Sequence, residues 1–173
     1  YSERRETVTA ALDRLGVESS TAVDEADLDD LPETQRRRLG YVVRENERVL
    51  RASDALAAGN TATVGDLLLT AHEDLAANFE ASCAELDTAV EAAIEAGAHG
   101  ARVTGAGWGG AIVALVDAGE AAGVENELHE TYCAQFPDRE PRSHLIAPAG
   151  GVRVERLQSR RLRVRSRGRS RSP

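Results

Sequence analysis

The residues with the clearest chemical potential are four glycines within six positions of the stretch ARVTGAGWGGAIVALV, residues 101–116. Glycine has no Cβ atom, so successive backbone N–H groups can turn toward one point and approach an anion closely. Phosphate oxygens suit such a loop, and a preceding threonine hydroxyl would add one donor. The alternative is a glycine-rich hairpin packed against a neighbouring helix. We expect a phosphate-contacting loop of seven residues: Thr104, Gly105, Ala106, Gly107, Trp108, Gly109 and Gly110.

The glycine spacing matches GxGxxG, but the surrounding sequence does not fit a dinucleotide-binding motif. That motif needs a strand before the loop and a helix after it, whereas this loop runs directly into the strand-like AIVALV, residues 111–116. The Walker A motif needs a lysine, and the sequence contains none. A protein-kinase loop also lies between strands, but no HRD or DFG sequence accompanies this one. The pattern indicates a strand–loop–strand unit outside these three classes.

Few other side chains have the spacing of a catalytic or metal site. His72 is expected to be structural. The remaining histidines, which show no ligand or triad spacing, are His99, His129 and His144. Five aspartates fall on predicted helices, where solvated faces are the usual location: Asp13, Asp54, Asp66, Asp74 and Asp87. Cys83 and Cys133 form no CxxC pair, which favours buried thiols in a reducing compartment and no metal. We assign no catalytic or metal-ligating residue to this chain.

The period of the apolar residues changes near residue 100, from helical to strand-like. Helices are expected over residues 2–15, 34–58, about 61–75, 82–97 and 120–134. Strands are expected over residues 101–104, 111–116, 143–148 and 151–157. Thr61 or Thr63 should cap the third helix and Ser82 the fourth. An acidic linker, residues 24–33, should separate the first two helices.

These elements predict an α+β fold, with helices packed on one face of a small antiparallel, ferredoxin-like sheet. The second helix should bury an apolar stripe made of Leu39, Val42, Val43, Val49, Leu50 and Leu56. Residues 1–157 are expected to form this domain. Residues 158–173, rich in Arg and Ser, lose all periodicity and are expected to be disordered.

The charge is divided between an acidic body and a basic tail. Residues 152–173 hold nine of the 21 basic residues and one of the 29 acidic ones, so the rest of the chain carries a net charge of −16. Such a body would repel nucleic acid and anionic membranes, and it suits a high-salt cytosol, so a halophilic source is one hypothesis. With no apolar run long enough to span a bilayer and no signal-peptide layout, we expect a cytoplasmic protein.

Four ordered blocks resemble the galactokinases, within the superfamily that also holds homoserine, mevalonate and phosphomevalonate kinases. GARVTGAGWGGAIVALV is similar to the third signature motif of that superfamily. YSERRETVTAALDRLGVES resembles the galactokinase run of Tyr, a polar pair, Arg-Arg and a helix ending in Leu-Gly-Val. YVVRENERVLRASDALAAGN and AHEDLAANFEASCAELDTAVEAA are similar to two galactokinase helices. The departures from the family pattern are Tyr41, Ala71, Phe79 and Ala84.

The resemblance implies the C-terminal lobe of a kinase that phosphorylates galactose to galactose 1-phosphate, using ATP and Mg2+. It places Tyr1 at the sugar and residues 104–110 near the transferred phosphoryl group, with Trp108 as a packing residue at the base of the loop. The family's catalytic Asp and Arg and its nucleotide-wrapping motif belong to an N-terminal lobe without a counterpart in this sequence. We therefore expect an N-terminally truncated kinase that is inactive alone and partners a missing lobe.

Two other functions stay open. A stand-alone small-molecule-binding module of ferredoxin-like type would need a pocket formed without a second lobe. A nucleic-acid binder would use the basic tail, but no aromatic residues alternate with its arginines to stack bases, and the tail also resembles an off-frame extension. A single lobe should expose an apolar face that its partner normally covers, so self-association through that face is expected.

Overall fold

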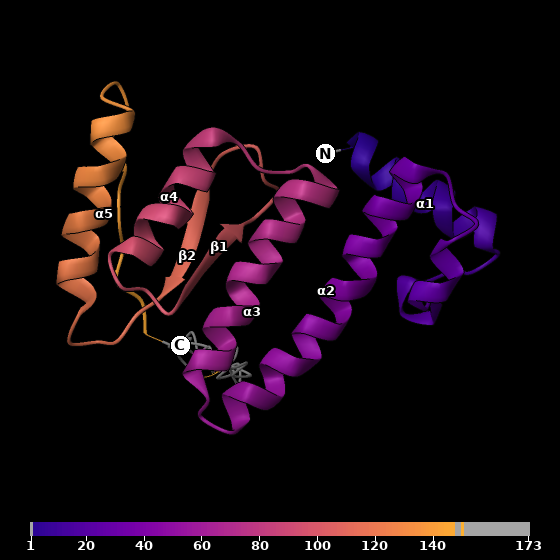
Figure 1. Ribbon diagram of the computed structural model, residues 1–173, viewed down its shortest axis with the longest axis horizontal. Helices are drawn as coiled ribbons and strands as arrows, with labels where there is room; N and C mark the ends of the chain where they lie inside the picture. The colour runs from indigo at the N-terminus through magenta and orange to yellow at the C-terminus, as the bar shows by residue number, and fades with distance from the viewer. Residues whose placement is uncertain (1, 148–149, 151–173) are drawn as a thin grey trace, which may run out of the picture.

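The computed structural model describes residues 2–147 and 150, which form an α+β fold with one two-stranded antiparallel sheet (Figure 1). The elements in chain order are α1 (Ser2–Leu15), α2 (Glu33–Ala57), α3 (Thr61–Asp74), α4 (Ala84–Glu95), β1 (Gly100–Thr104), β2 (Ala111–Leu115) and α5 (Ala121–Gln135). Short helical turns at Ser20–Ala22, Glu25–Leu28 and Leu75–Phe79 complete the chain's regular structure in these residues. The hairpin of α2 and α3 separates α1 from the sheet, which lies with α4 and α5 (Figure 1). The predicted α+β class is confirmed.

The acidic segment between α1 and α2 belongs to the core and is not the open linker that its charges predict. Val23, Leu28 and Leu31 are 5–6% exposed and pack in one cluster with Ala11 of α1 and Leu39 of α2. Leu28 and Leu31 lie three residues apart, and the amide of Leu31 donates to the carbonyl of Leu28 at 3.1 Å. This tight turn brings the two leucines to one side, because residues three apart eclipse in 3-10 geometry.

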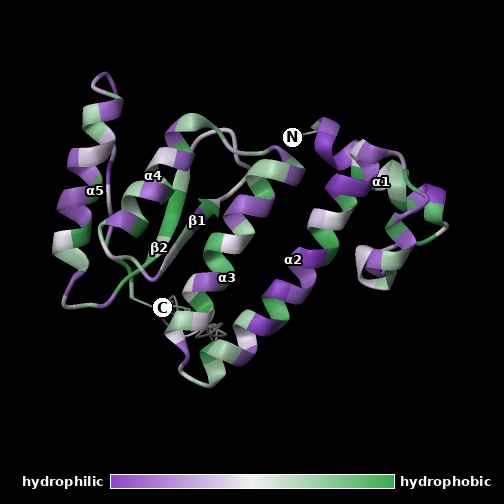
Figure 2. Cartoon of the chain, in the orientation of Figure 1, coloured by the Kyte–Doolittle hydropathy of each residue, from purple (hydrophilic) through white to green (hydrophobic). Residues whose placement is uncertain are grey.

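The second half of α2 buries a different stripe from the one that its apolar residues predict. Val49, Leu50 and Leu56 are 61%, 68% and 64% exposed, so their expected burial is wrong. Arg48 and Ala55 are buried instead, with 7% of each residue exposed. They lie seven positions apart, on the side of α2 that faces α3. An arginine therefore occupies a core position. The side of α2 that is covered passes through Arg48, one residue before Val49 of the apolar stripe. Figure 2 shows that α2 is largely hydrophilic, in contrast to the hydrophobic β2.

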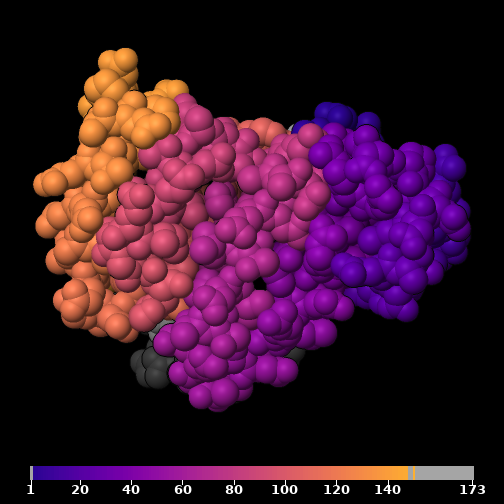
Figure 3. Space-filling view, viewed as in Figure 1, coloured from indigo at the N-terminus to yellow at the C-terminus, as the bar shows by residue number. Residues whose placement is uncertain are grey.

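The sheet pairs β1 and β2 in antiparallel register from Gly100 opposite Leu115 to Thr104 opposite Ala111. Side chains alternate between its two faces. Ala101, with no exposed surface, packs beside Ala114 in a cluster with residues of α4 and α5. The space-filling view shows these elements and the α2–α3 hairpin filling one continuous body (Figure 3).

Helix α3 approaches β1 so closely that both contact positions are glycines. A Cβ atom on Gly65 would lie 2.1 Å from the carbonyl oxygen of His99, and one on Gly100 would lie 2.1 Å from that of Gly65. Real Cβ atoms do not come this near to backbone oxygens. The backbone of α3 therefore packs directly on the backbone at the start of β1. This contact sets the distance between the helix and the strand.

Two helix caps differ from the prediction. Asn60, and neither Thr61 nor Thr63, caps α3, because its side-chain oxygen accepts a hydrogen bond from the Thr63 amide at 3.1 Å. Cys83 occupies the N-cap position of α4 without a side-chain bond, while the hydroxyl of Ser82 bonds to a carboxylate of α4. The cap of α3 is thus the side-chain amide oxygen of Asn60, where a threonine hydroxyl was predicted.

The predicted strand over residues 143–148 is wrong for residues 143–147, which form no strand. Leu145 and Ile146 are 76% and 74% exposed, because no paired strand holds them against the sheet. The predicted strand over residues 151–157 and the tail, residues 158–173, lie outside the described residues. A ferredoxin-like sheet needs those additional strands, so that detail stays a prediction.

Candidate functional site

The glycine stretch forms a tight loop between β1 and β2, as the strand–loop–strand prediction requires. The four glycines of the loop have positive φ angles: Gly105 (88°), Gly107 (83°), Gly109 (134°) and Gly110 (100°). Trp108 also has a positive φ, at 55°. Residues with a Cβ atom rarely adopt this backbone conformation. The loop is made largely of residues in left-handed backbone conformation, and this explains why it is rich in glycine.

The loop is anchored on the segment that precedes α4. The amide of Trp108 donates to the carbonyl of Ala81 at 3.1 Å. A Cβ atom on Gly107 would lie 2.0 Å from that same oxygen, whereas one on Gly105 or Gly109 would meet nothing within 4 Å. Gly107 therefore serves close packing, as the hairpin interpretation predicts. The other glycines serve the backbone conformation.

Among residues 105–110, which lie between the paired strands, the Trp108 amide is the one backbone donor that is engaged within residues 2–147 and 150. The structure thus brings the predicted residues 104–110 together in one turn, with several amides free of protein partners in that part of the chain. Trp108 is 40% exposed, and Thr104 is exposed. Tyr1, the predicted sugar-binding residue, lies outside the described residues. The loop is able to present N–H groups to an anion such as phosphate.

Between α2 and α3 lies a buried ion cluster that the sequence interpretation missed. Asp74 is 9% exposed, so its expected place on a solvated helix face is wrong. Arg44 donates to both of its oxygens, at 2.9 and 2.7 Å, Arg48 donates at 2.7 Å, and Asn78 donates at 2.7 Å. Burial alone would raise the pKa of Asp74, but these hydrogen bonds outweigh it and lower the pKa to about 2. The carboxylate stays charged and joins α2 to α3.

The cluster extends from α2 to the sheet. Glu45 accepts a hydrogen bond from Arg48 at 2.8 Å and another from Arg102 of β1. Arg102 therefore links the strand that leads into the glycine loop to the buried pair on α2. The spacing of three residues between Glu45 and Arg48 was a helical signal for such pairing. The partner on α3 was not visible from that spacing.

A second polar group joins α3 to the start of α4. His72 is 6% exposed, and its Nε2 lies 3.3 Å from Oδ1 of Asp87, which also accepts a hydrogen bond from the Ser82 hydroxyl. Burial lowers the pKa of His72, although the carboxylate of Asp87 opposes that change. The histidine holds the segment beside Ala81 in place, which fits the structural role expected for it.

This histidine predicts a loss of stability at mildly acidic pH. Its pKa is lower in the folded chain than the ordinary value near 6.5, so the unfolded chain binds the proton more readily. The free energy of unfolding is expected to fall as pH decreases from about 6.5 through the folded pKa. Urea denaturation at a series of pH values measures this slope.

His72→Gln is expected to flatten the slope of stability against pH below about pH 6.5. His144→Gln, which removes an exposed imidazole, is the matched control. Equal slopes in the wild type and in His72→Gln would show that the buried imidazole carries none of the pH dependence.

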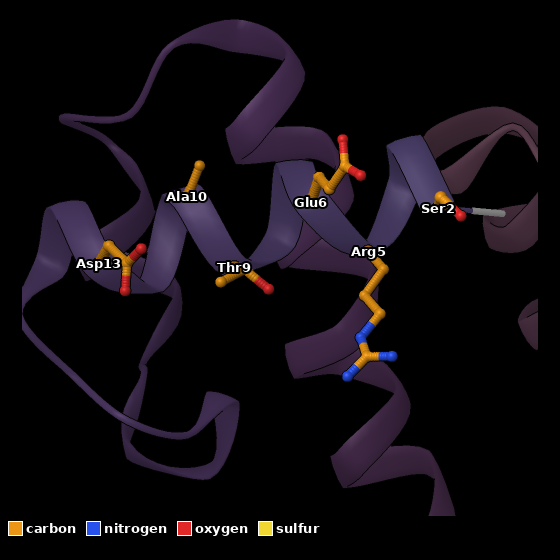
Figure 4. Close-up of a pocket in the computed structure, with 6 residues that line it drawn as sticks. All are labelled: Ser2, Arg5, Glu6, Thr9, Ala10 and Asp13. Carbon is orange, nitrogen blue, oxygen red and sulfur yellow. The ribbon is translucent and has the colours of Figure 1, made fainter.

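The remaining candidate sites are weak. A shallow hollow on the outer face of α1 is lined by Ser2, Arg5, Glu6, Thr9, Ala10 and Asp13 (Figure 4). All six residues come from one helix, whereas small-molecule sites enclose most of their ligand. Within residues 2–147 and 150, no group of three His, Cys, Asp or Glu side chains is placed to hold a metal ion. The helices of this part of the chain are also too short or too polar to cross a membrane.

The two cysteines differ in their surroundings. Cys83 is half-buried before α4, and Cys133 is exposed on α5. The expectation that both thiols are buried is therefore wrong for Cys133, because α5 packs against α4 with its other side, which carries the buried Val124. Both thiols are free.

Similarity to known proteins extends over most of the chain. Residues 52–134 match the family described as GHMP kinases C terminal. The chain is 47% identical to the galactokinase of Thermococcus kodakarensis and 45% identical to that of Pyrococcus furiosus, in each case over 89% of this chain and 44% of the relative. A crystal structure of Lactococcus lactis galactokinase complexed with galactose matches 79% of this chain and 37% of that one, with a TM-score of 0.70 and 32% identity. The chain thus spans less than half the length of these relatives.

Proposed function

Because this chain contains a galactokinase-like GHMP kinase C-terminal domain, we propose that it forms one lobe of a kinase that transfers a phosphoryl group from ATP to galactose. The observation that carries the proposal is the glycine loop, a left-handed turn anchored at Trp108 on the carbonyl of Ala81. Phosphoryl transfer depends mainly on positioning and on stabilising negative charge. A rigid loop of backbone donors is suited to both tasks.

In this proposal, residues 104–110 face the phosphoryl group as it moves between ATP and the sugar. Backbone N–H groups fixed before the reaction can stabilise charge that develops on the transferred oxygens without reorganising. The side chain of Tyr1 contacts the sugar, and the hydroxyl of Thr104 offers one more donor beside the loop. No residue of this chain acts as the catalytic base, which belongs to a second lobe.

Mg2+ accompanies ATP in this proposal, but its ligands are not assigned to this chain. The donor set of Mg2+ is carboxylate and phosphate oxygen. Residues 2–147 and 150 contain no cluster of three acidic or imidazole side chains that suits it. The described residues therefore do not fit a resident magnesium site. A cytoplasmic location and self-association through an uncovered apolar face complete the proposal.

A stand-alone small-molecule-binding module is the less favoured alternative. The hollow on α1 is lined by one helix, and the charged cluster around Asp74 is filled by its own hydrogen bonds. Neither encloses a ligand as binding pockets do. The relatives over this length are galactokinases, which supports the kinase lobe instead.

The direct test joins this chain to the N-terminal part of the Thermococcus kodakarensis galactokinase, which is 47% identical to it over the shared region. We call this protein the joined kinase. It is expected to convert galactose and ATP to galactose 1-phosphate and ADP, whereas the chain alone and the N-terminal part alone are not. A coupled assay for ADP measures the activity. A folded but inactive joined kinase, or an active chain alone, would contradict the proposal.

A further inference from the structure

Arg4, in the first turn of α1, joins this helix to the glycine loop. Its Nε donates to the carbonyl oxygen of Phe79 at 2.8 Å, and its Nη2 donates to that of Glu80 at 3.3 Å. Its Cζ atom lies 5.7 Å from the centre of the Trp108 ring, within cation–π range. One side chain, only 14% exposed, therefore contacts both the segment that carries the loop and the loop itself.

The segment that Arg4 grips is held firmly by other arginines. Glu80 has a left-handed backbone, with φ at 55°, and its carboxylate accepts hydrogen bonds from Arg37 at 3.1 Å and Arg38 at 3.2 Å. Arg4 completes this set at 3.5 Å. Charge-assisted hydrogen bonds of this kind are about twice as strong as neutral ones. Arg4 thus links this support to the ring of Trp108, a residue that is 40% exposed.

We propose that Arg4 is a positioning residue that sets the place of Trp108, and with it the backbone donors of the glycine loop. It does so from the end of α1 next to Tyr1, so it also ties the sugar-contacting end of the helix to the phosphate-contacting loop. This proposal rests on the proposed function of residues 104–110. Trp108 makes two directional interactions, a hydrogen bond from its amide to the Ala81 carbonyl and a cation–π contact between its ring and Arg4. Of these two, only the hydrogen bond remains without Arg4.

Fluorescence of the 173-residue chain tests the positioning directly, because Trp108 is its only tryptophan. In Arg4→Gln, we expect the emission maximum to shift to longer wavelength and the acrylamide quenching constant to rise, since the ring loses its cover. Arg5→Gln is the matched control, because Arg5 is exposed on the neighbouring position of the same helix (Figure 4). Circular dichroism establishes that each variant is folded. If Arg4→Gln does not fold, Arg4→Lys takes its place, because lysine cannot contact both carbonyls and the ring together.

Unchanged emission and quenching in a folded Arg4 variant would overturn the proposal. This arm needs no kinase activity, so its result stands even if the joined kinase does not phosphorylate galactose. A joined kinase that does not phosphorylate galactose would count against the proposed function and not against the role of Arg4.

Kinetics of the joined kinase supply the second arm. A misplacement of about 1 Å can lower turnover by about 100-fold. We expect Arg4→Gln to lower kcat by about 10- to 100-fold with the KM for galactose unchanged, and Arg4→Lys to restore part of the loss. A purely structural role predicts less folded enzyme with normal kcat per folded molecule. That result would overturn the link between Arg4 and the loop.

Discussion

Replacing Asp74 by alanine is expected to lower the free energy of unfolding by about 3 kcal/mol, the lower end of the range for breaking a buried ion pair. Arg48 has a side chain that is 9% exposed, and it would lose its carboxylate partner on α3. The low end applies because Arg48 keeps Glu45 at 2.8 Å, and the side chain of Arg44 is 32% exposed and can turn toward water. Urea denaturation at pH 7, followed by circular dichroism, measures the change.

Asp66→Ala is the matched control, since Asp66 is exposed on the same helix and its loss should change stability by no more than about 0.5 kcal/mol. The stability difference between the wild type and Asp74→Ala should also depend on pH. Because the pKa of Asp74 is about 2, its stabilising contribution is full above its ordinary pKa of 3.8 and is lost as pH falls toward 2. The gap between wild type and Asp74→Ala should therefore narrow below about pH 4. A gap that stays constant would mean that the carboxylate charge is not what stabilises this cluster.

Gly107→Val in the joined kinase is expected to lower turnover by about 10²–10³-fold, the usual effect of losing one well-aimed donor to developing negative charge. The added Cβ would lie 2.0 Å from the carbonyl oxygen of Ala81, at a φ of 83° that side chains rarely adopt. A contact this short forces the backbone on one side or the other to shift. The loop must move, and its amides move with it.

The control for backbone strain alone is Gly16→Val at the end of α1. Gly16 has a φ of 70°, and a Cβ atom there meets nothing within 4 Å. This variant should lose stability with normal turnover per folded molecule. Melting temperature and turnover are measured on the same preparation of each protein. Near-normal turnover in folded Gly107→Val would mean that the glycines serve packing only, and the phosphate interpretation would fail.

The glycine loop shows what can be predicted from sequence here. Four glycines between two apolar runs require a left-handed turn between strands, because local chemistry alone decides that outcome. The bounds of α1 agree with the prediction for the same reason, since a regular apolar stripe ends at a glycine. The support of the loop could not be predicted. The carbonyl of Ala81 meets Trp108 only because α4 and the sheet fold onto each other.

Asp74 and α2 show the opposite case. An aspartate near a helix end appears solvated in the sequence, and its burial depends on two arginines that another helix brings to it. Those arginines also displaced the predicted stripe of α2, since a paired guanidinium can occupy a buried position that hydrophobicity assigns to Val49. Charge pairs between two helices leave no regular spacing of residues in the sequence of either helix. They become visible only once the helices are placed side by side.

The contact between Gly65 and Gly100 also constrains how this sequence can evolve. In each case the obstacle to a side chain is a backbone oxygen 2.1 Å away, so no substitution elsewhere can make room by becoming smaller. A mutation at either position has no compensating partner short of moving the helix. The cluster around Asp74 differs, because apolar residues of similar volume can replace a buried ion pair together. Among descendants of this protein, the ion cluster is free to drift in composition, while the two glycines are fixed.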